Sequence, residues 1–347
     1  TLQREANGRF GYSARRTLQL AQALYERHKM ITYPRTDSRA LPEDYLPVVR
    51  EALGAIAKAP ELPPGCGPLA GHAAKALESD WVKPNRRIFN NAKVSDHFAI
   101  IPTGQIHARL DEAEAKLFDL IAKRFIAVFY PSARFEVTTR ITRVEGEPFK
   151  TEGKILREAG WLAVYGREAE AGEGKVVPVS GGERADTVAV DVAALETRPP
   201  ARYTEATILT AMETAGKLLE DEELREAMKD RGLGTPATRA SIIEGLIYEH
   251  YVHREGRELV PSSKAISLIE LLRAIGVDAL VSPTLTGEWE HKLREIENGH
   301  MSRAEFMREI SDLTREIVGI AKSFEETDLG ARDRKSTRLN SSHESPS

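Results

Sequence analysis

Hydrophobic residues recur at helical spacing through much of the first part of the chain. Over residues 14–27 the apolar positions are three or four apart, and Ser13 just before them is a typical N-cap residue. This pattern predicts a helix that leads into Tyr33. Residues 60–68 are rich in proline and glycine and predict a loop, and residues 110–129 return to helical spacing. We expect residues 1–108 to form a mainly helical domain.

The character changes after residue 130. Residues 135–141 and 187–192 alternate polar and apolar positions and are rich in β-branched side chains, as strands are. Residues 168–174 and 180–182 have the composition of hairpin tips or variable loops. We therefore expect residues 109–202 to be a β-rich domain.

Helical spacing returns over residues 203–325. Thr204 is a candidate N-cap for a helix over 205–216, and Thr235 with Pro236 at the first helical position predicts a second helix. Residues 251–260 then predict a hairpin turning at Glu255 and Gly256, followed by a helix capped by Ser262 or Ser263. This order is winged-helix-like and only weakly diagnostic of nucleic-acid contact.

The helical pattern stops near Phe324. Residues 326–347 have no periodicity and few apolar side chains, so we expect a disordered tail, which resembles translated adapter sequence more than natural protein.

Composition is that of a soluble globular protein with two or three domains. The chain has 347 residues, of which 41% are hydrophobic and 29% charged. No stretch approaches the roughly 20 apolar residues that span a bilayer, and the first residues lack a secretory pattern, so a cytoplasmic location is expected. The single cysteine, Cys66, excludes an internal disulfide and four-cysteine zinc modules, and we expect it to be a passive loop residue.

Charge is unevenly distributed. The formal net charge of -4 argues against indiscriminate coating of nucleic acid. The first forty residues, however, hold eight Lys or Arg against three acidic residues, a local excess that suits a DNA backbone. A basic, solvated helix face is the alternative interpretation.

Residues 31–39 carry the most specific chemistry. Proline favours an extended conformation in the residue before it, and residues two apart in an extended segment share a face, so Tyr33, Arg35 and Asp37 are expected on one side. A tyrosine hydroxyl attacks poorly as the neutral phenol, whereas a fixed cation favours the phenolate and also holds a phosphate oxygen. Asp37 could orient Arg35. From spacing alone, a half-buried tyrosine beside a surface ion pair remains the alternative.

Residues 31–39, with sequence ITYPRTDSR, resemble the active-site segment of type IA DNA topoisomerases. Three further segments carry the same resemblance: residues 1–17, the histidine motif at 95–103 and the glycine-threonine motif at 232–240. In their detailed form they resemble bacterial topoisomerase III. The resemblance implies that Tyr33 attacks a DNA phosphodiester and carries the 5′ phosphate, with Arg35 and His97 as phosphate ligands and Asp37 as support.

The histidine and glycine motifs each have a structural alternative. His97 could serve packing alone, or Asp96 could fix its tautomer and leave the other ring nitrogen for a phosphate. The turn from Gly232 to Thr238 feeds a helix N-terminus, which favours an anion, although capping alone also explains Thr235.

The resemblance also implies DNA contacts by further residues of these motifs: Thr36, Ser38, Arg39, Thr235, Thr238 and Arg239.

No acidic cluster for magnesium and no nucleotide-binding loop is present in the sequence. A phosphotyrosine link retains the bond energy, so no nucleotide cofactor is needed. In the family, the metal-binding (toprim) domain precedes the region corresponding to Thr1. We therefore expect Mg²⁺ in a full-length enzyme, with ligands outside this chain.

The resemblance implies a multidomain, mainly α protein with a β-rich arch segment, a partial toroid made of domains II to IV of the type IA core. We expect strand cleavage, passage and religation on single-stranded DNA, with a helicase or a single-strand-binding protein as partners. Two alternatives remain: a non-catalytic single-stranded DNA-binding module, and a tyrosine recombinase, whose adduct would have the opposite polarity.

Overall fold

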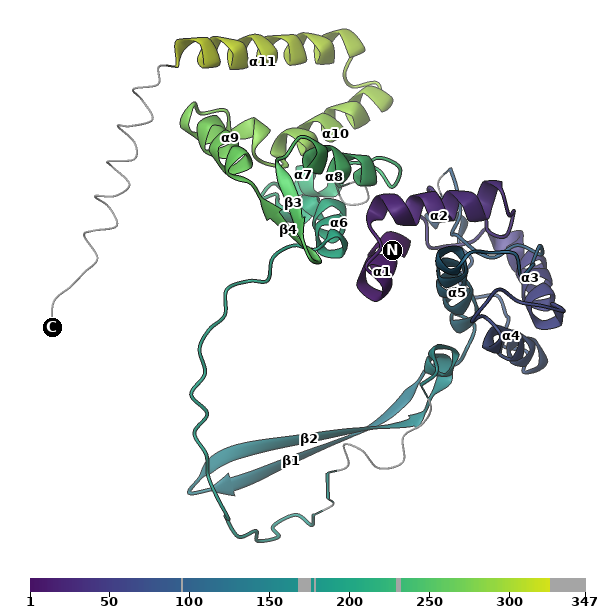
Figure 1. Cartoon of the computed structure of the whole chain (residues 1–347). Coiled ribbons are helices and arrows are strands. Elements are labelled where there is room, and N and C mark those ends of the chain that lie inside the picture. Colours follow the sequence, from purple (N-terminus) through teal and green to yellow (C-terminus); the bar gives the residue numbers. More distant parts are fainter. Residues whose placement is uncertain (95, 168–175, 178, 229–231, 325–347) are drawn as a thin grey trace. The chain divides into compact units, whose positions relative to one another are not determined.

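The structure, a computed structural model, describes residues 1–94, 96–167, 176–177, 179–228 and 232–324 (Figure 1). The chain divides into two compact units. The first joins Thr1–Arg16 to the described residues from Ala201 onward, and the second is Thr17–Pro200. The grouping therefore does not follow chain order, because the first sixteen residues go with the C-terminal part.

Helices form the core of the second unit. Helix α3 packs against α4, and α4 packs against α5. The apolar side chains that these helices share are fully buried, and burial of one such side chain contributes about 1.5–3 kcal/mol. The core therefore provides a rigid support for the loops between its helices. The helices are α2 (Ala14–Glu26, in this unit from Thr17 on), α3 (Leu46–Lys58), α4 (Pro68–Glu78) and α5 (Glu112–Ala127), with short 3₁₀ turns η1 (Glu43–Tyr45) and η2 (Asn91–Lys93).

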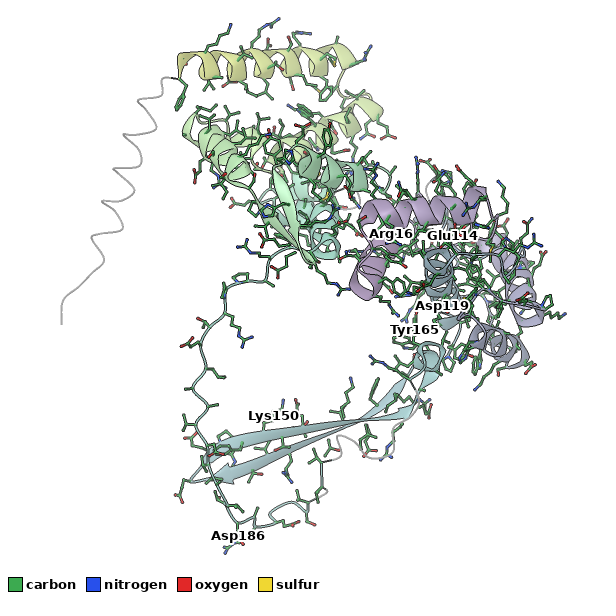
Figure 2. The ribbon with its side chains drawn as sticks, viewed as in Figure 1. Arg16, Glu114, Asp119, Lys150, Tyr165 and Asp186 are labelled. Atoms are coloured by element: carbon green, nitrogen blue, oxygen red, sulfur yellow. The ribbon has the colours of Figure 1, made fainter. Side chains whose placement is uncertain are left out.

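A long hairpin follows α5. Strands β1 (Arg134–Val144) and β2 (Glu147–Glu158) pair antiparallel, which confirms the strand predicted over residues 135–141. Glu145 and Gly146 both have positive φ, 50° and 87°, as a tight two-residue hairpin turn requires. Side chains such as Lys150 project from the hairpin into solvent (Figure 2). The 3₁₀ helix η3 (Gly160–Tyr165) comes after it.

The prediction of a strand over residues 187–192 is wrong. These residues are exposed and have no regular secondary structure, although Val188 and Val190 alternate with polar positions as expected of a strand. Alternation specifies which side chains share a face but provides no hydrogen-bonding partner, and the strand pairs described in this unit are those of β1 with β2.

The first unit has the winged-helix-like order that the sequence predicts. Helix α8 (Arg239–Tyr248) is followed by the hairpin of β3 (Val252–Glu255) and β4 (Glu258–Pro261), and then by α9 (Ser263–Ala274). A small apolar cluster is formed by Ala215, Leu219 and Met228. The remaining elements are α1 (Leu2–Phe10), α6 (Glu205–Glu213), η4 (Ala215–Leu218), α7 (Glu222–Met228), η5 (Asp278–Leu280), α10 (Thr284–Glu297) and α11 (Arg303–Ser323).

Most of the predicted helix starts are confirmed. The Ser13 hydroxyl accepts from the Arg16 amide, the Thr204 hydroxyl from the Thr207 amide, and the Ser262 hydroxyl from the Ala265 amide. The start of α8 differs from the prediction. Its N-cap is Thr238, and Thr235 and Pro236 lie in the turn that directly precedes the helix.

Some predictions fall outside the described residues, namely those for the tail at 326–347 and the loop at 168–174. Within the described part of the chain, none of the helices combines the length and apolar content needed to cross a membrane.

Candidate functional site

The segment that carries Tyr33 runs beside residues 97–103. Ile31 forms an antiparallel bridge with Pro102, and the Thr32 amide donates to the Ile101 carbonyl at 3.0 Å. The Thr32 hydroxyl donates to the Ala99 carbonyl at 3.1 Å. Ile31 and Ile101 are buried, so apolar packing adds to these bonds. Two motifs that are distant in the sequence are thus held together by backbone pairing.

This pairing places the rings of Tyr33 and His97 in contact. Their centroids lie 4.2 Å apart with an angle of 43° between the ring planes. Tyr33 is half-buried and His97 is exposed, so solvent reaches the contact. A hydroxyl and an imidazole beside one another at an exposed surface can act on one phosphate group.

Two hydroxyls of the motif are already used within the protein. The Thr36 hydroxyl donates to the His97 carbonyl at 3.0 Å and accepts from the Ser38 amide. The Ser38 hydroxyl donates to the Lys93 carbonyl at 2.8 Å. In this structure both residues hold the backbone around Tyr33 and His97, a role that the sequence analysis did not predict.

The charged residues of the motif lie at the surface. Arg35 and Asp37 are exposed and form no ion pair with each other, so the expected support of Arg35 by Asp37 is not seen. Asp96 and His97 form no hydrogen bond, so the expected fixing of the His97 tautomer by Asp96 is not seen either. Among the described residues Arg35 has no hydrogen-bonding partner, which leaves its guanidinium available for a ligand. Arg39 is also exposed.

Tyr25 is a neighbour of Tyr33 that sequence reasoning missed. The two rings meet edge to face, with centroids 5.5 Å apart and an interplanar angle of 82°. The Lys29 ammonium lies 5.8 Å from the centroid of the Tyr25 ring. The sequence placed Tyr25 among the regularly spaced apolar residues of the helix, but helical spacing does not say which side chain meets that face.

The glycine-threonine motif belongs to the first unit. Gly232 and Gly234 have φ of 66° and 69°, and a side chain at Gly232 would come within 2.3 Å of the Met212 carbonyl oxygen. Glycine is therefore required at Gly232 by both backbone conformation and space. The Thr238 hydroxyl accepts from the Thr235 amide at 2.8 Å, and both threonines are exposed.

Arg239 is buried, with only 8% of its surface exposed. Its Nε donates to the Leu233 carbonyl at 3.1 Å. In this arrangement Arg239 supports the glycine turn from the inside, whereas the family resemblance implies a contact with the DNA backbone.

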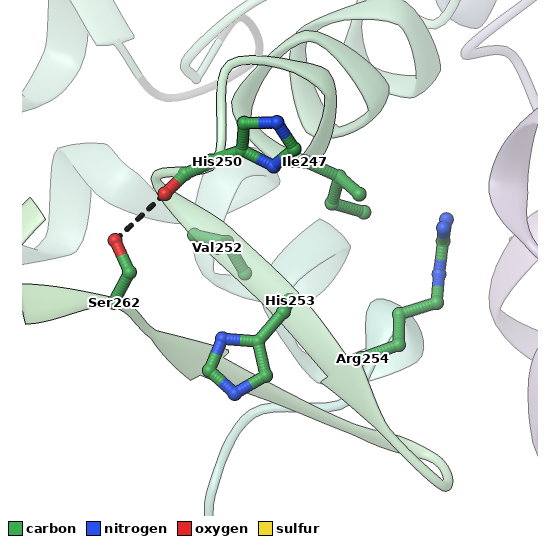
Figure 3. A pocket seen from close by; sticks show the side chains of 6 residues that line it. All are labelled: Ile247, His250, Val252, His253, Arg254 and Ser262. Carbon is green, nitrogen blue, oxygen red and sulfur yellow. Dashed lines mark hydrogen bonds between the residues drawn. The ribbon is translucent and has the colours of Figure 1, made fainter. Parts of the chain in front are cut away.

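A hollow lies beside the β3–β4 hairpin (Figure 3). In it the Ser262 hydroxyl donates to the His250 carbonyl at 2.7 Å. Arg254 is its most basic residue, but the guanidinium pairs with the carboxylates of Glu205 and Glu244 at 2.7 and 2.6 Å. Because both carboxylates compensate its charge, the hollow is poorly suited to an anion. Its lining consists of Ile247, His250, Val252, His253, Arg254 and Ser262.

The described residues contain no cluster of three or more metal-ligand side chains, and the single cysteine is buried. Nowhere in residues 1–94, 96–167, 176–177, 179–228 and 232–324 do three or more His, Cys, Asp or Glu side chains gather in a way that could hold a metal ion. Cys66 is fully buried, and burial raises the pKa of its thiol to about 12. The thiol therefore stays protonated at neutral pH, and protonated thiols are poor nucleophiles.

Comparison with known proteins gives one consistent family. The family model described as DNA topoisomerase matches residues 1–308. DNA topoisomerase 3 of Bacillus cereus is 39% identical over 93% of this chain, and that of Bacillus licheniformis is 40% identical over 93%. The chain covers 44% of each of these two relatives, so it spans slightly less than half their length.

A solved structure agrees with these relatives. Full-length topoisomerase I from Thermotoga maritima matches with a TM-score of 0.63 and 26% identity. The match covers 91% of this chain and 48% of that protein.

Proposed function

This chain belongs to the DNA topoisomerase family, and we propose that it is the strand-cleaving part of a type IA enzyme of the topoisomerase III kind. In this proposal Tyr33 breaks one strand of DNA, another strand passes through the break, and the first strand is resealed. The net effect is relaxation or decatenation of DNA without ATP. The observation that carries the proposal is the contact between the rings of Tyr33 and His97 at 4.2 Å.

The proposed step is a transfer between two oxygen atoms. The Tyr33 hydroxyl oxygen attacks the phosphorus of a single-stranded DNA linkage, a P–O bond forms to the tyrosine, and the bond from phosphorus to the 3′ oxygen breaks. The tyrosine gives up its proton and the departing 3′ oxygen takes one up. The 3′ hydroxyl can reverse the reaction because the phosphotyrosine ester retains the bond energy.

Arg35 and His97 are proposed to hold the phosphate oxygens during this step. Charge-assisted hydrogen bonds from a guanidinium stabilise the negative charge that builds up on the phosphorus centre. Arg35 is exposed and has no ion-pair partner among the described residues, as this role requires. The contacts of Thr36 and Ser38 favour a supporting role for these two residues, while Arg39 is proposed to contact the DNA.

Thr235 and Thr238 are proposed to contact a backbone phosphate from the turn before α8. Both residues are exposed, and the turn leads into a helix N-terminus, which favours an anion. Arg239 is proposed to shape this turn through its hydrogen bond to Leu233.

A Mg²⁺ ion prefers carboxylate and phosphate oxygens, and among the described residues no group of three or more His, Cys, Asp or Glu side chains gathers to hold a metal ion. We propose that its ligands belong to a part of the enzyme outside this chain. Relaxation of supercoiled DNA by this polypeptide alone is then expected to be weak or absent. A helicase or a single-strand-binding protein is a candidate partner because each exposes or holds single strands.

An activated substrate tests the chemistry with this chain alone. In a single-stranded oligonucleotide, one 3′ bridging oxygen is replaced by sulfur. A thiolate leaves without a proton donor and religates poorly, so the covalent product should accumulate. The expected result is an adduct on Tyr33 with the wild-type chain and none with Tyr33→Phe.

The position of the sulfur separates the alternatives. An isomeric probe with sulfur at the 5′ bridging position would react in an enzyme of tyrosine-recombinase polarity, and adduct from that probe alone would contradict the proposal. Binding of the oligonucleotide without adduct from either probe would indicate a non-catalytic DNA-binding module, which the winged-helix-like order of the first unit would explain.

A further inference from the structure

Tyr33 needs a fixed ring as well as an activated oxygen. Its hydroxyl can attack in line only if the ring holds one orientation, and displacements of about 1 Å cost roughly a hundredfold in rate. The polypeptide around Tyr33 is irregular, since the segment from Thr32 to Arg39 contains neither helix nor strand. The orientation of the ring therefore depends on the side chains that touch it.

Among the described residues, two rings meet Tyr33. His97 lies at 4.2 Å with a tilt of 43°, and Tyr25 approaches at 5.5 Å with an interplanar angle of 82°. Edge-to-face pairs of this kind are favoured by the ring quadrupoles and have a defined geometry. His97 is exposed and is proposed to bind phosphate, so Tyr25 is the neighbour whose contact with Tyr33 is independent of the ligand.

Tyr25 itself stands on a well-fixed element. It is on the last turn of α2, directly after Leu24, which is fully buried. The Met30 amide donates to the Leu24 carbonyl at 2.9 Å, and the Thr103 amide donates to the Met30 carbonyl at 2.9 Å. These bonds tie the end of α2 to the segment beside Tyr33, so the ring of Tyr25 is presented from a supported position.

The contact uses the ring of Tyr25 and not its hydroxyl. Among the described residues the Tyr25 hydroxyl forms no hydrogen bond. The Lys29 ammonium lies 5.8 Å from the centroid of the same ring, close enough for a cation–π attraction that adds to the fixing of the ring.

We propose that Tyr25 is a positioning residue that holds the ring of Tyr33 in the orientation for attack. The inference rests on the proposed function. It predicts that an aromatic ring at position 25 is required for fast cleavage, that the hydroxyl is dispensable, and that DNA affinity does not depend on either.

The test compares single-turnover rates on the 3′-sulfur oligonucleotide at saturating concentration. Tyr25→Phe keeps the ring and should react at the wild-type rate. Tyr25→Leu removes the ring and should react at least about tenfold more slowly, while its dissociation constant for the unmodified oligonucleotide stays within about twofold of wild type.

A matched control separates positioning from general loss of packing. Tyr165, labelled in Figure 2, forms an edge-to-face pair with Trp161 at 5.8 Å. It belongs to the same unit as Tyr33 but is far from Tyr33 in the sequence. Tyr165→Leu should lower the melting temperature as much as Tyr25→Leu does but leave the cleavage rate unchanged. If Tyr25→Leu does not fold, Tyr25→Met supplies a flexible apolar side chain of similar length and should show the same slow cleavage.

Several results would overturn the inference. They are wild-type cleavage by Tyr25→Leu or Tyr25→Met, equally slow cleavage by Tyr25→Phe, or a loss of DNA affinity that accounts for the slower rate. Failure of the proposed function looks different, because the wild-type chain itself would then form no adduct.

Discussion

Thr36 donates its hydroxyl proton to the backbone carbonyl of His97 at 3.0 Å. The bond joins the segment of Tyr33 to the segment of His97 at the residue whose ring touches Tyr33. A side chain that the family resemblance suggests as a DNA contact thus has a structural role in the free protein.

Replacement of Thr36 by valine should loosen this junction. Thr36→Val keeps the shape and removes the hydroxyl, so we expect a loss of about 1 kcal/mol in the free energy of unfolding and a cleavage rate about tenfold lower. Thr36→Ser restores the hydroxyl and should recover most of both. Urea unfolding and adduct formation measure the two effects, and a fully active Thr36→Val would show that the bond does not matter for His97.

Arg35 should affect chemistry without affecting stability. Because the side chain is exposed and unpaired among the described residues, Arg35→Ala should change the free energy of unfolding by less than about 0.5 kcal/mol. Its rate of adduct formation should fall by about a hundredfold, as expected for the loss of one charged donor at a reacting phosphate. Arg198 is also exposed, and Arg198→Ala is the control that should react normally. Similar rates for the two variants would remove Arg35 from the site.

Arg239 should show the opposite behaviour. Its buried guanidinium donates to the Leu233 carbonyl, so Arg239→Met leaves that acceptor unpaired and should cost about 1–3 kcal/mol. Thr235→Val changes an exposed residue and should cost less. Chemical denaturation distinguishes the two. An Arg239→Met variant of wild-type stability but weakened DNA binding would favour the direct DNA contact that the family resemblance implies.

The different burial of these two arginines could not be predicted from the sequence. Residues Arg35 and Arg239 stand in equally specific motifs, yet one is exposed and the other is buried. Local spacing says nothing about which segment covers a side chain. The contact of Tyr33 with His97 was likewise implied by family resemblance alone, because it depends on pairing between distant segments.

Local features were predicted more reliably. Thr204 and Ser262 cap their helices as expected, and the hairpin over residues 252–261 forms at the predicted turn, because both depend on interactions between near neighbours. The strand expected at 187–192 did not form because alternation supplies no partner strand. Tyr25 was missed for a related reason, since its role depends on the ring it meets.

Cys66 should be inert in the folded protein. Burial raises the pKa of its thiol to about 12, and the side chain has no exposed surface. Iodoacetamide at mildly alkaline pH should not modify the native chain but should modify it in concentrated urea, as mass spectrometry can show. Rapid modification of the native chain would contradict the burial.

The raised pKa of Cys66 also makes the stability of the fold depend on pH. The folded-state pKa of Cys66 lies above the ordinary value of 9.0, so the protonated thiol contributes stability that is present below that value and is lost as the pH rises towards 12. The free energy of unfolding of the wild-type chain should therefore fall more steeply with alkaline pH than that of Cys66→Ala. Parallel curves for the two proteins would exclude this contribution.

The most direct test of the whole account is the site and polarity of the covalent link to DNA. After reaction with the 3′-sulfur oligonucleotide, protease digestion and mass spectrometry should find the 5′-phosphorylated end of the DNA attached to the peptide that contains Tyr33. Attachment to a different residue, attachment through a 3′ phosphate, or no attachment by a chain that binds the oligonucleotide would contradict the central claim.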